Sequence, residues 1–380
     1  MPITPDHIFF RDQLSRFVKD RIRPLAAEID RSDTFPKELF REMGRLGYYG
    51  IRYPKKSGGL EADTLTCSIF VEEIARGSLA FGVICLMQIL MGTDFLFRFG
   101  SREIKERLFY PALKGEKIGV IAFTEPDCGS DLASIRTLAR KEGNDFVLKG
   151  SKTWITNAPI ADFFTVAAST DRSLGLKGIN FFLVEKDTPG FEVGKNIEKT
   201  GALGSCTGEI FFDDCRIPGD HLLGAELNKG SVYLLEILGD IRIMVASLAL
   251  GLAGAALDES ISYAKERQAF GNPIAKYQLI QEKIARMATE IEASRWLIYQ
   301  ACTLKDQKAP FAREAMMAKV HATETAMMAV DEARRIHGAY GFSREYTVER
   351  LYRDAGFLLF GGGTHEILAL NIARDILKNA

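Results

Sequence analysis

The sequence lacks any marked excess of charge. Its 380 residues carry 49 lysines and arginines against 50 aspartates and glutamates, and no basic block stands out. Nucleic acids and anionic membrane surfaces are bound through clusters of positive charge. The balance therefore gives no sign of a nucleic-acid or membrane partner.

Cysteine is scarce and scattered, and the six cysteines include no C-x-x-C pair. Disulfide frameworks and zinc sites rely on repeated, closely spaced cysteines, so we expect reduced thiols and no metal site. The first residues, MPITPDHIFFRDQ, lack a basic region followed by an apolar core and so do not resemble a secretory signal. We accordingly expect a cytoplasmic protein.

Long hydrophobic runs are missing too. The longest, residues 244–257, is rich in glycine and alanine and is shorter than the about 20 residues that a membrane span needs. This run predicts a buried, closely packed helix.

Two periodicities divide the chain. Apolar residues recur at helical spacing over residues 8–114 and again from residue 229, whereas residues 119–224 alternate with a period of two. Long amphipathic helices with short connections form bundles. We predict an α+β fold with an N-terminal helical domain (1–118), a middle antiparallel β-domain (119–225) and a C-terminal helical bundle (226–380).

One stretch, residues 123–157, combines a polar loop with an aromatic strand. The loop holds turn-forming residues and hydroxyls, and Trp154 lies in the strand that follows it. An indole offers stacking area, and hydroxyls and backbone N–H groups offer hydrogen bonds, which suits a flat and partly polar ligand such as a flavin. The same composition also fits an ordinary surface loop.

The motif T-E-P-x-x-G-S-D, followed by W-I-T-N, resembles the signature of the acyl-CoA dehydrogenase family, and the likeness extends over residues 8–377. Members of that family are FAD flavoproteins with these three domains, so the resemblance implies FAD as cofactor and an acyl-CoA substrate. It also places six residues around the flavin ring and the thioester. They are Phe123, Thr124, Gly129, Ser130, Trp154 and Thr156.

The resemblance implies a cofactor site shared between subunits of a homotetramer. Arg267 and Phe270 belong to an R-x-x-F-G segment that reaches the FAD of a neighbouring subunit, with Gln278 nearby. A guanidinium suits the pyrophosphate because it binds phosphate oxygens in bidentate fashion. For Arg267 the alternative is a solvated charge at a helix end.

Two further segments match the family on the cofactor side. Residues 336–342 match a glycine-rich turn along the adenine, which brings Arg335 and Gly338 to the cofactor. Thr364 and Glu366 open the last helix, with Thr364 as its expected N-cap. Glu366 is expected to be a cofactor-side or capping group rather than a base.

The family's proton-abstracting base is missing. Many members carry a glutamate in a C-terminal Y-E-G-T loop, but Gly362 stands at that position here. A second lineage places its glutamate directly before the arginine that corresponds to Arg242, and this chain has Ile241 there. Arg242 itself, near the CoA-side contacts in the family, is as compatible with a structural role as with substrate binding.

Four explanations stay open. The protein is a non-catalytic acyl-CoA binder, a flavin enzyme whose chemistry needs no α-proton base, or an ordinary dehydrogenase or reductase with an unrecognised acid/base group. In the fourth, favoured here, a relocated carboxylate removes a proton from the vinylogous γ-carbon of an unsaturated thioester. Gly361 and Gly362 would then leave room for a broad acyl group.

Asp94 is the candidate for the relocated base. Met91 and Asp94 share one apolar helix face by their spacing, and the corresponding helix lines the acyl pocket in the family. A carboxylate there would have a raised pKa, as a general base near neutrality requires. The alternative is an exposed ion pair between Asp94 and Arg98. Asp240 is the reserve candidate, against a solvated charge.

An alicyclic acyl group meets these conditions, because a ring needs breadth and a ring enoyl thioester has acidic γ-hydrogens. The pattern is similar to the family branch that oxidises cyclohexene-carboxyl-CoA thioesters in anaerobic aromatic degradation. Electrons would pass to electron-transferring flavoprotein or a similar acceptor.

Overall fold

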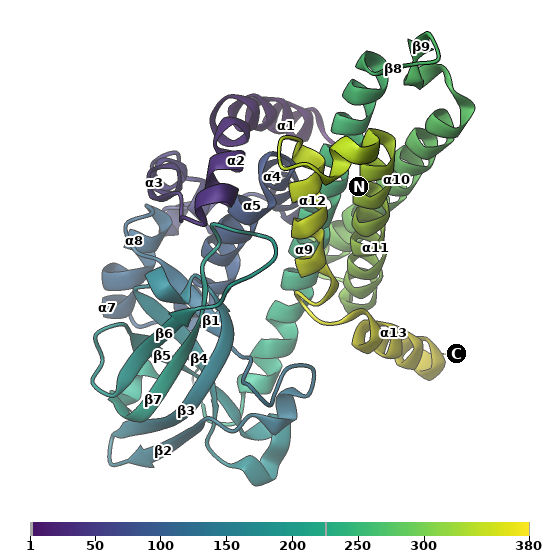
Figure 1. Cartoon of the computed structure of the whole chain (residues 1–380). Coiled ribbons are helices and arrows are strands. Elements are labelled where there is room, and N and C mark those ends of the chain that lie inside the picture. The colour runs from purple at the N-terminus through teal and green to yellow at the C-terminus, as the bar shows by residue number, and fades with distance from the viewer. Residues whose placement is uncertain (1–2, 225, 380) are drawn as a thin grey trace.

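The computed structural model describes residues 3–224 and 226–379, and the chain forms helices, then strands, then helices (Figure 1). The helices before the sheet are α1 Pro5–Phe17, α2 Arg23–Ser32, α3 Lys37–Arg45, α4 Thr64–Gly77, α5 Leu79–Leu86, α6 Asp94–Phe99, α7 Arg102–Ile104 and α8 Tyr110–Leu113. The helices after it are α9 Gly230–Glu266, α10 Gln278–Asp306, α11 Ala312–His337, α12 Thr347–Ala355 and α13 His365–Asn379. The predicted fold class is confirmed.

The middle sheet is mixed, with more antiparallel than parallel strand pairs. Its strands are β1 Gly119–Ala122, β2 Leu138–Glu142, β3 Asp145–Thr156, β4 Phe163–Ser169, β5 Ile179–Glu185, β6 Phe191–Asn196 and β7 Thr207–Ile217. They run in the order β1-β4-β2-β3-β7-β6, with β5 beside β4. The exceptions to the expected antiparallel pairing are at β4, to which β1 and the first residue of β2 pair in parallel.

The long helix α9 packs against helices of both helical regions, α4 before the sheet and α10 and α11 after it. Glycines let it approach α4 closely. A Cβ at Gly251 would lie 2.1 Å from the carbonyl oxygen of Glu72, so only glycine fits there. The predicted buried run at 244–257 is the part of α9 in this interface.

Two segments, Leu79–Phe99 and Gly230–Glu266, are apolar and long enough to cross a membrane. Most of each is buried inside the protein, so both are core helices of this fold. The apolar stretches are thus longer than the sequence analysis indicated, because polar residues within them are buried as well.

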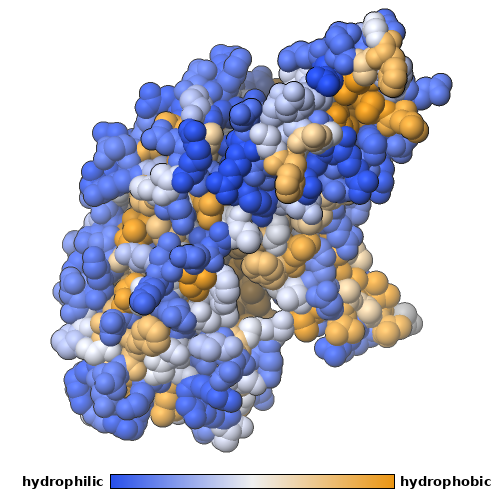
Figure 2. All heavy atoms as spheres, viewed as in Figure 1, coloured by the Kyte–Doolittle hydropathy of each residue, from blue (hydrophilic) through white to orange (hydrophobic). Residues whose placement is uncertain are grey.

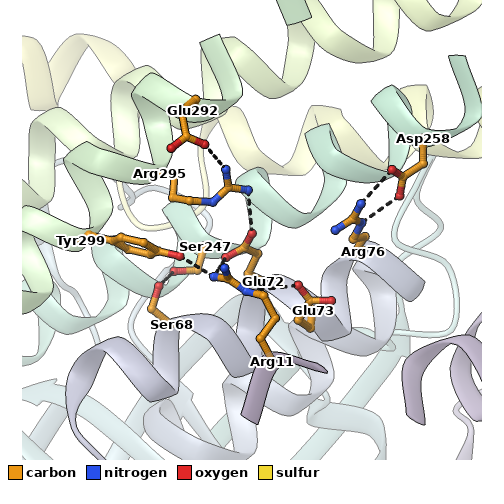
Figure 3. A network of polar contacts seen from close by, with 10 residues as sticks. All are labelled: Arg11, Ser68, Glu72, Glu73, Arg76, Ser247, Asp258, Glu292, Arg295 and Tyr299. Atoms are coloured by element: carbon orange, nitrogen blue, oxygen red, sulfur yellow. Dashed lines mark hydrogen bonds and ion pairs between the residues drawn. The ribbon is translucent and has the colours of Figure 1, made fainter. Parts of the chain in front are cut away.

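A charged network fastens α1 and α10 to α4 (Figure 3). Arg11 contacts Glu72 at 3.3 Å and Glu73 at 3.7 Å, and it also donates a hydrogen bond to Tyr299. Arg295 of α10 donates to the other oxygen of Glu72 at 3.1 Å. The network joins the first helices of the chain to the C-terminal bundle.

Candidate active site

A buried ion pair holds the polar loop after β1. The carboxylate of Glu125 accepts hydrogen bonds from Nζ of Lys152 at 2.7 Å and from the backbone N–H groups of Arg136 and Thr137 at 2.6 and 3.0 Å. Burial acts to raise the pKa of Glu125, but Lys152 and the hydrogen bonds outweigh it and lower that pKa. Lys152 also donates to the carbonyl of Phe123 at 3.0 Å. The pair fixes the loop against β3.

Strand β3 turns Trp154 outward. The pairing of β3 with β7 shifts register between Lys152 and Ile155, and Trp154 takes a positive φ of 60° at this irregularity. Such a backbone conformation is uncommon for a bulky residue. As a result the indole is 54% exposed beside the loop, although its neighbours in the strand are buried.

The other ring-side residues lie around this platform. Gly129 and Ser130 are exposed in the loop, and a Cβ at Gly129 would meet nothing within 4 Å. Phe123 and Thr156 are partly buried, and the carbonyl of Thr124 accepts from the N–H of Thr153. The loop therefore offers open backbone and hydroxyl groups next to an exposed indole.

Asn157, which directly follows β3, is fully buried, yet its side-chain oxygen and nitrogen have no hydrogen-bond partner among the described residues. Buried polar groups are normally paired, because leaving them unpaired costs about 1–3 kcal/mol. The groups open to a ligand are the exposed indole of Trp154 and the exposed residues Gly129 and Ser130 of the loop, which together suit a flat ligand with polar edges. The residues present therefore fit a flavin ring.

The residues expected at a neighbouring subunit's cofactor lie apart from this platform. Arg267 follows α9, Phe270 lies in the β8–β9 hairpin (Gln268–Ala269 and Asn272–Pro273), and Gln278 begins α10. In Figure 1 this tip projects from the far end of the helices. Phe270 is 95% exposed, and Figure 2 shows an apolar patch over the tip. Within one chain, these three residues are therefore not close to the flavin platform around Trp154.

Arg335 and Gly338 line a cavity of about 280 Å3 together with Asp331, Arg334, Gly341 and Phe342. Nε of Arg335 donates to Asp331 at 2.7 Å. Thr364 caps α13, since its hydroxyl accepts from the N–H of Ile367 at 3.5 Å. Glu366 is exposed in the first turn of that helix.

The two positions at which the family would carry its base meet in space. A Cβ at Gly362 would lie 3.5 Å from Cγ2 of Ile241 and 3.5 Å from Cγ2 of Val245. Gly361 lies against the ring of Phe357. Both alternative base positions thus share one region of the site, and here that region holds a hydrogen atom and an aliphatic side chain.

A buried lysine holds the glycine loop at this region. Nζ of the fully buried Lys319 donates to the carbonyls of Leu359 and Gly363 at 3.2 and 2.8 Å, which fixes the glycine loop. Burial, reinforced by the positive charge of Arg242, lowers the pKa of Lys319 to about 8. Arg242 is partly buried, and its Nε has no partner among the described residues.

The two candidate carboxylates, Asp94 and Asp240, share one guanidinium. Arg52 donates to Asp94 at 3.0 Å and to Asp240 at 2.8 Å. Burial alone would lower the pKa of Arg52, but the two carboxylates raise it above its ordinary value. The guanidinium of Arg98 lies 3.7 Å from the other carboxylate oxygen of Asp94. The ammonium of Lys305 lies 2.5 Å from the other carboxylate oxygen of Asp240.

The helical face proposed for Asp94 is interrupted. A π-helical turn spans Met87–Met91, and Asp94 begins the separate helix α6, so Met91 and Asp94 do not continue one regular face. Asp94 is buried rather than exposed, although the expected pair with Arg98 is present. Its surroundings are charged, whereas the sequence predicted an apolar face.

Sequence reasoning missed Lys152, Asn157, Arg52 and Lys319. Glu125 stands inside the T-E-P motif, and strand alternation points Lys152 inward beside it, so this pair carried a readable signal. Arg52 contacts residues 42 and 188 positions away, and no local pattern marks such a contact. Among residues 3–224 and 226–379, no three metal-ligating side chains gather.

Comparison with known proteins agrees with this arrangement. Residues 4–116, 120–215 and 228–377 match the N-terminal, middle and C-terminal domains of acyl-CoA dehydrogenases. The chain is 46% identical over 374 residues to benzylmalonyl-CoA dehydrogenase of Aromatoleum aromaticum, covering 98% of each, and 41% identical over 379 residues to 3-(aryl)acrylate reductase of Clostridium sporogenes, covering 100% of each. Butyryl-CoA dehydrogenase of Megasphaera elsdenii superposes with a TM-score of 0.95 at 35% identity, covering 99% of each chain.

The fold and the flavin platform define an oxidoreductase acting on CH–CH groups, with FAD as its cofactor. The chain belongs to the acyl-CoA dehydrogenase family, and its reaction class is the flavin-dependent dehydrogenation of an acyl-CoA thioester.

Proposed function

We propose that this enzyme dehydrogenates a CoA thioester that carries a carboxylate on its α-carbon and a ring next to its β-carbon, with loss of the carboxylate as CO2. The observation that supports this proposal is the meeting of Gly362 and Ile241 at the place of the family base. Neither residue removes a proton, so the electron pair at the α-carbon has to come from another bond.

Loss of CO2 supplies that electron pair. The bond between the α-carbon and the carboxylate breaks, its electrons form the new double bond to the β-carbon, and the β-hydrogen leaves as hydride. FAD, when bound, accepts this hydride and its two electrons. The polar loop at Thr124–Ser130 and Trp154 would hold and cover the flavin ring. The products are an enoyl thioester and CO2, so no protein base is required.

The names of two relatives favour this substrate class. A benzylmalonyl thioester has a carboxylate on the carbon next to the thioester, and a benzyl group that places a ring at the β-carbon. A 3-(aryl)acrylate has the same ring-bearing three-carbon skeleton without that carboxylate. Both share the ring at the third carbon, which the glycines at 361 and 362 would accommodate.

The test is anaerobic bleaching of the flavin in the FAD-loaded enzyme. We expect benzylmalonyl-CoA to bleach it, and 3-phenylpropanoyl-CoA, which has the same ring without the α-carboxylate, to bleach it at least about 100-fold more slowly, as expected without a general base. Equal rates with both thioesters would contradict the proposal and point to an unrecognised base.

A second candidate is the oxidation of a cyclohexene-carboxyl-CoA type thioester at its vinylogous carbon, with Asp94 as base. The observation that favours it is the burial of Asp94 beside Arg52, which also contacts the reserve candidate Asp240. Both oxygens of Asp94 already have arginine partners, which is why we place this function second.

Asp94→Asn separates the two functions. If Asp94 is the base, the substitution abolishes bleaching by cyclohexenoyl-CoA while FAD stays bound, and wild type responds to that thioester. If CO2 loss is the source of the electrons, wild type responds to benzylmalonyl-CoA, and Asp94→Asn keeps this response within about threefold. No bleaching by either thioester would favour a binding protein or another flavin reaction.

We also propose that the enzyme is a homotetramer, as its family resemblance implies. Arg267, Phe270 and Gln278 lie on a projecting tip away from the chain's own flavin platform, so they would serve the FAD of a neighbouring subunit in a homotetramer. We further propose electron-transferring flavoprotein as acceptor, a cytoplasmic location, and domains at 1–118, 119–225 and 226–380.

A further inference from the structure

The glycine loop, residues 359–363, has few contacts of its own that hold its shape. It contains three consecutive glycines, of which Gly362 and Gly363 take positive φ angles of 72° and 112°. Glycine loses more conformational freedom on folding than any other residue, so such a loop is costly to order. Two backbone hydrogen bonds, each 3.1 Å long, run from N–H groups of the loop to carbonyls within residues 357–360. The rest of its order has to come from its surroundings.

The first outside contact comes from α11. Lys319 is fully buried on that helix, and its Nζ donates to the carbonyls of Leu359 and Gly363 at 3.2 and 2.8 Å, one at each end of the loop. In the described part of the chain Lys319 forms no ion pair, unlike the equally buried Lys152, whose Nζ lies 2.7 Å from Glu125. Burying a charge is costly unless it is paired or hydrogen-bonded. The loop carbonyls thus stabilise the ammonium, and the ammonium holds both ends of the loop.

The second outside contact lies one helical turn further along α11. Thr323 follows Lys319 by four residues, so both side chains lie on one face of the helix. The hydroxyl of Thr323 donates to the backbone carbonyl of Lys319 at 2.8 Å, and it lies 2.5 Å from Nε2 of His365. A hydroxyl that gives its one proton to a carbonyl accepts from Nε2–H of the imidazole. Because His365 begins α13, this bond fixes the chain just after the loop.

We infer that Lys319 and Thr323 are positioning residues for the dehydrogenation. They form a two-point clamp on α11 that holds the glycine loop at a set distance from α9. The opposite wall of the gap is aliphatic, since a Cβ at Gly362 would lie 3.5 Å from Cγ2 of Ile241 and 3.5 Å from Cγ2 of Val245. This inference rests on the reaction class of the family and not on the particular substrate.

The clamp matters for the reaction because of what position 362 faces. In the family pattern the side chain at this position acts on the α-carbon of the thioester, so the α-carbon has to lie at the gap between the loop and α9. A loop that leaves its place lets the acyl carbons shift relative to the flavin. A misplacement of about 1 Å costs an enzyme roughly 100-fold in rate. The clamp therefore acts on the rate of flavin reduction more than on the affinity for the thioester.

The test uses Lys319→Met and Thr323→Val in the FAD-loaded enzyme, because each removes a clamp contact with little change in shape. Thr325→Val is the matched control. Thr325 is also buried on α11, but its hydroxyl accepts from Ser294 of α10 at 3.1 Å. Hydrogen exchange of residues 357–366, measured by mass spectrometry, should be about 10-fold faster in Lys319→Met, less increased in Thr323→Val and unchanged in the control. Unchanged exchange in both clamp variants would overturn the inference.

Anaerobic flavin reduction by benzylmalonyl-CoA is measured on the same proteins. At saturating thioester we expect the rate to fall about 100-fold in Lys319→Met and about 10-fold in Thr323→Val, with the dissociation constant changed less than about threefold. Faster exchange with an unchanged rate would show that the clamp only stabilises the fold, and would overturn the inference while leaving the proposed function intact. Thr323→Val decides alone if Lys319→Met does not fold.

A different result separates the proposed function from the clamp. If benzylmalonyl-CoA does not reduce the wild-type flavin, the proposed function fails, and the clamp is judged from the flavin absorbance shift that bound 3-phenylacryloyl-CoA causes at saturation. A shift that decreases in Lys319→Met and Thr323→Val but not in Thr325→Val supports the clamp. Equal shifts in all of these proteins overturn it.

Discussion

Gly362 is the residue at which the chemistry of this chain departs most from the family pattern. Its φ of 72° is the left-handed conformation that favours glycine, and a Cβ there would make only ordinary contacts with Ile241 and Val245. The space for a side chain is therefore present even though the side chain is not. What limits a substitution is backbone strain, which costs about 1 kcal/mol for a non-glycine residue.

Gly362→Glu should create the missing base. We expect this variant to bleach its flavin with 3-phenylpropanoyl-CoA about 100-fold faster than wild type, because general-base catalysis contributes roughly that much or more. Stopped-flow absorbance of the FAD-loaded protein measures the rate. Gly362→Gln carries the same strain without a base and should stay at the wild-type rate. A Gln variant as fast as the Glu variant would show that shape, not proton abstraction, sets the rate.

Glu73 predicts a pH dependence of stability. Burial, together with the charge of Glu72, raises the pKa of Glu73 from 4.5 to about 7. The positive charges of Arg76, Arg11 and Arg295 act to lower that pKa but do not outweigh these two effects. The pKa of Glu73 is higher in the folded protein than in the unfolded chain. The stability that Glu73 contributes to the folded protein is therefore fully present below pH 4.5 and is lost as the pH rises through 7. Wild type should therefore lose about 2–3 kcal/mol relative to Glu73→Gln between pH 5 and pH 8.

Urea unfolding of the two FAD-loaded proteins at both pH values measures this difference. Glu292→Gln, which changes a half-exposed member of the same network, is the control and should show less than about 0.5 kcal/mol of pH-dependent difference. A difference between wild type and Glu73→Gln that does not change with pH would contradict the account of Glu73.

Among single residues, the sequence predicted those of the flavin platform better than the ion-pair partners of the two candidate carboxylates. The motif at 123–157 pointed to Trp154 and the polar loop because these residues are contiguous. It did not reveal that Asn157 is buried without a partner, or that Arg52 joins Asp94 to Asp240, since both depend on elements distant in the chain.

Among the elements, α9 and α4 depend on close backbone approach. Gly251 and Gly254 lie three residues apart on α9 and differ sharply in their surroundings. A Cβ at Gly251 would lie 2.1 Å from the Glu72 carbonyl oxygen, whereas a Cβ at Gly254 would lie 3.7 Å from Nε of Arg76. The interface thus requires glycine at the first position but not at the second.

Gly251→Ala should destabilise the protein by about 1–3 kcal/mol, because α4 or α9 has to shift to relieve the overpacking. Gly254→Ala is the matched control and should be neutral or stabilising by up to about 1 kcal/mol, since alanine favours the helix. Urea unfolding of both variants checks the pair. Equal stabilities would mean that α4 and α9 do not pack as closely as the structure indicates.

Helical and strand periodicity predicted the long elements but not their irregularities. The long helices α9, α10, α11 and α13 all lie in the part of the chain, from residue 229 onward, where helical spacing predicted a bundle. The π-helical turn at Met87–Met91 was not predicted, because spacing rules assume one regular helix, and it changes the position of Asp94 relative to that face. The parallel pairing of β1 with β4 was not predicted, because the alternation of residues along a strand does not encode the direction of its neighbour.

For the whole molecule, the central claim is that loss of CO2 leaves on the α-carbon the electron pair that, in the family pattern, removal of the α-proton by a glutamate would leave there. Three elements meet in this claim: α9 provides Ile241, α11 provides Lys319, and the loop before α13 provides Gly362.

The most direct test is a single anaerobic turnover of the FAD-loaded enzyme with benzylmalonyl-CoA labelled with 13C in its free carboxyl group. Labelled CO2 and reduced flavin are measured in the same sample. The account predicts that they form in equal amounts and at the same rate. Flavin reduction with the label retained in the enoyl thioester product would contradict it.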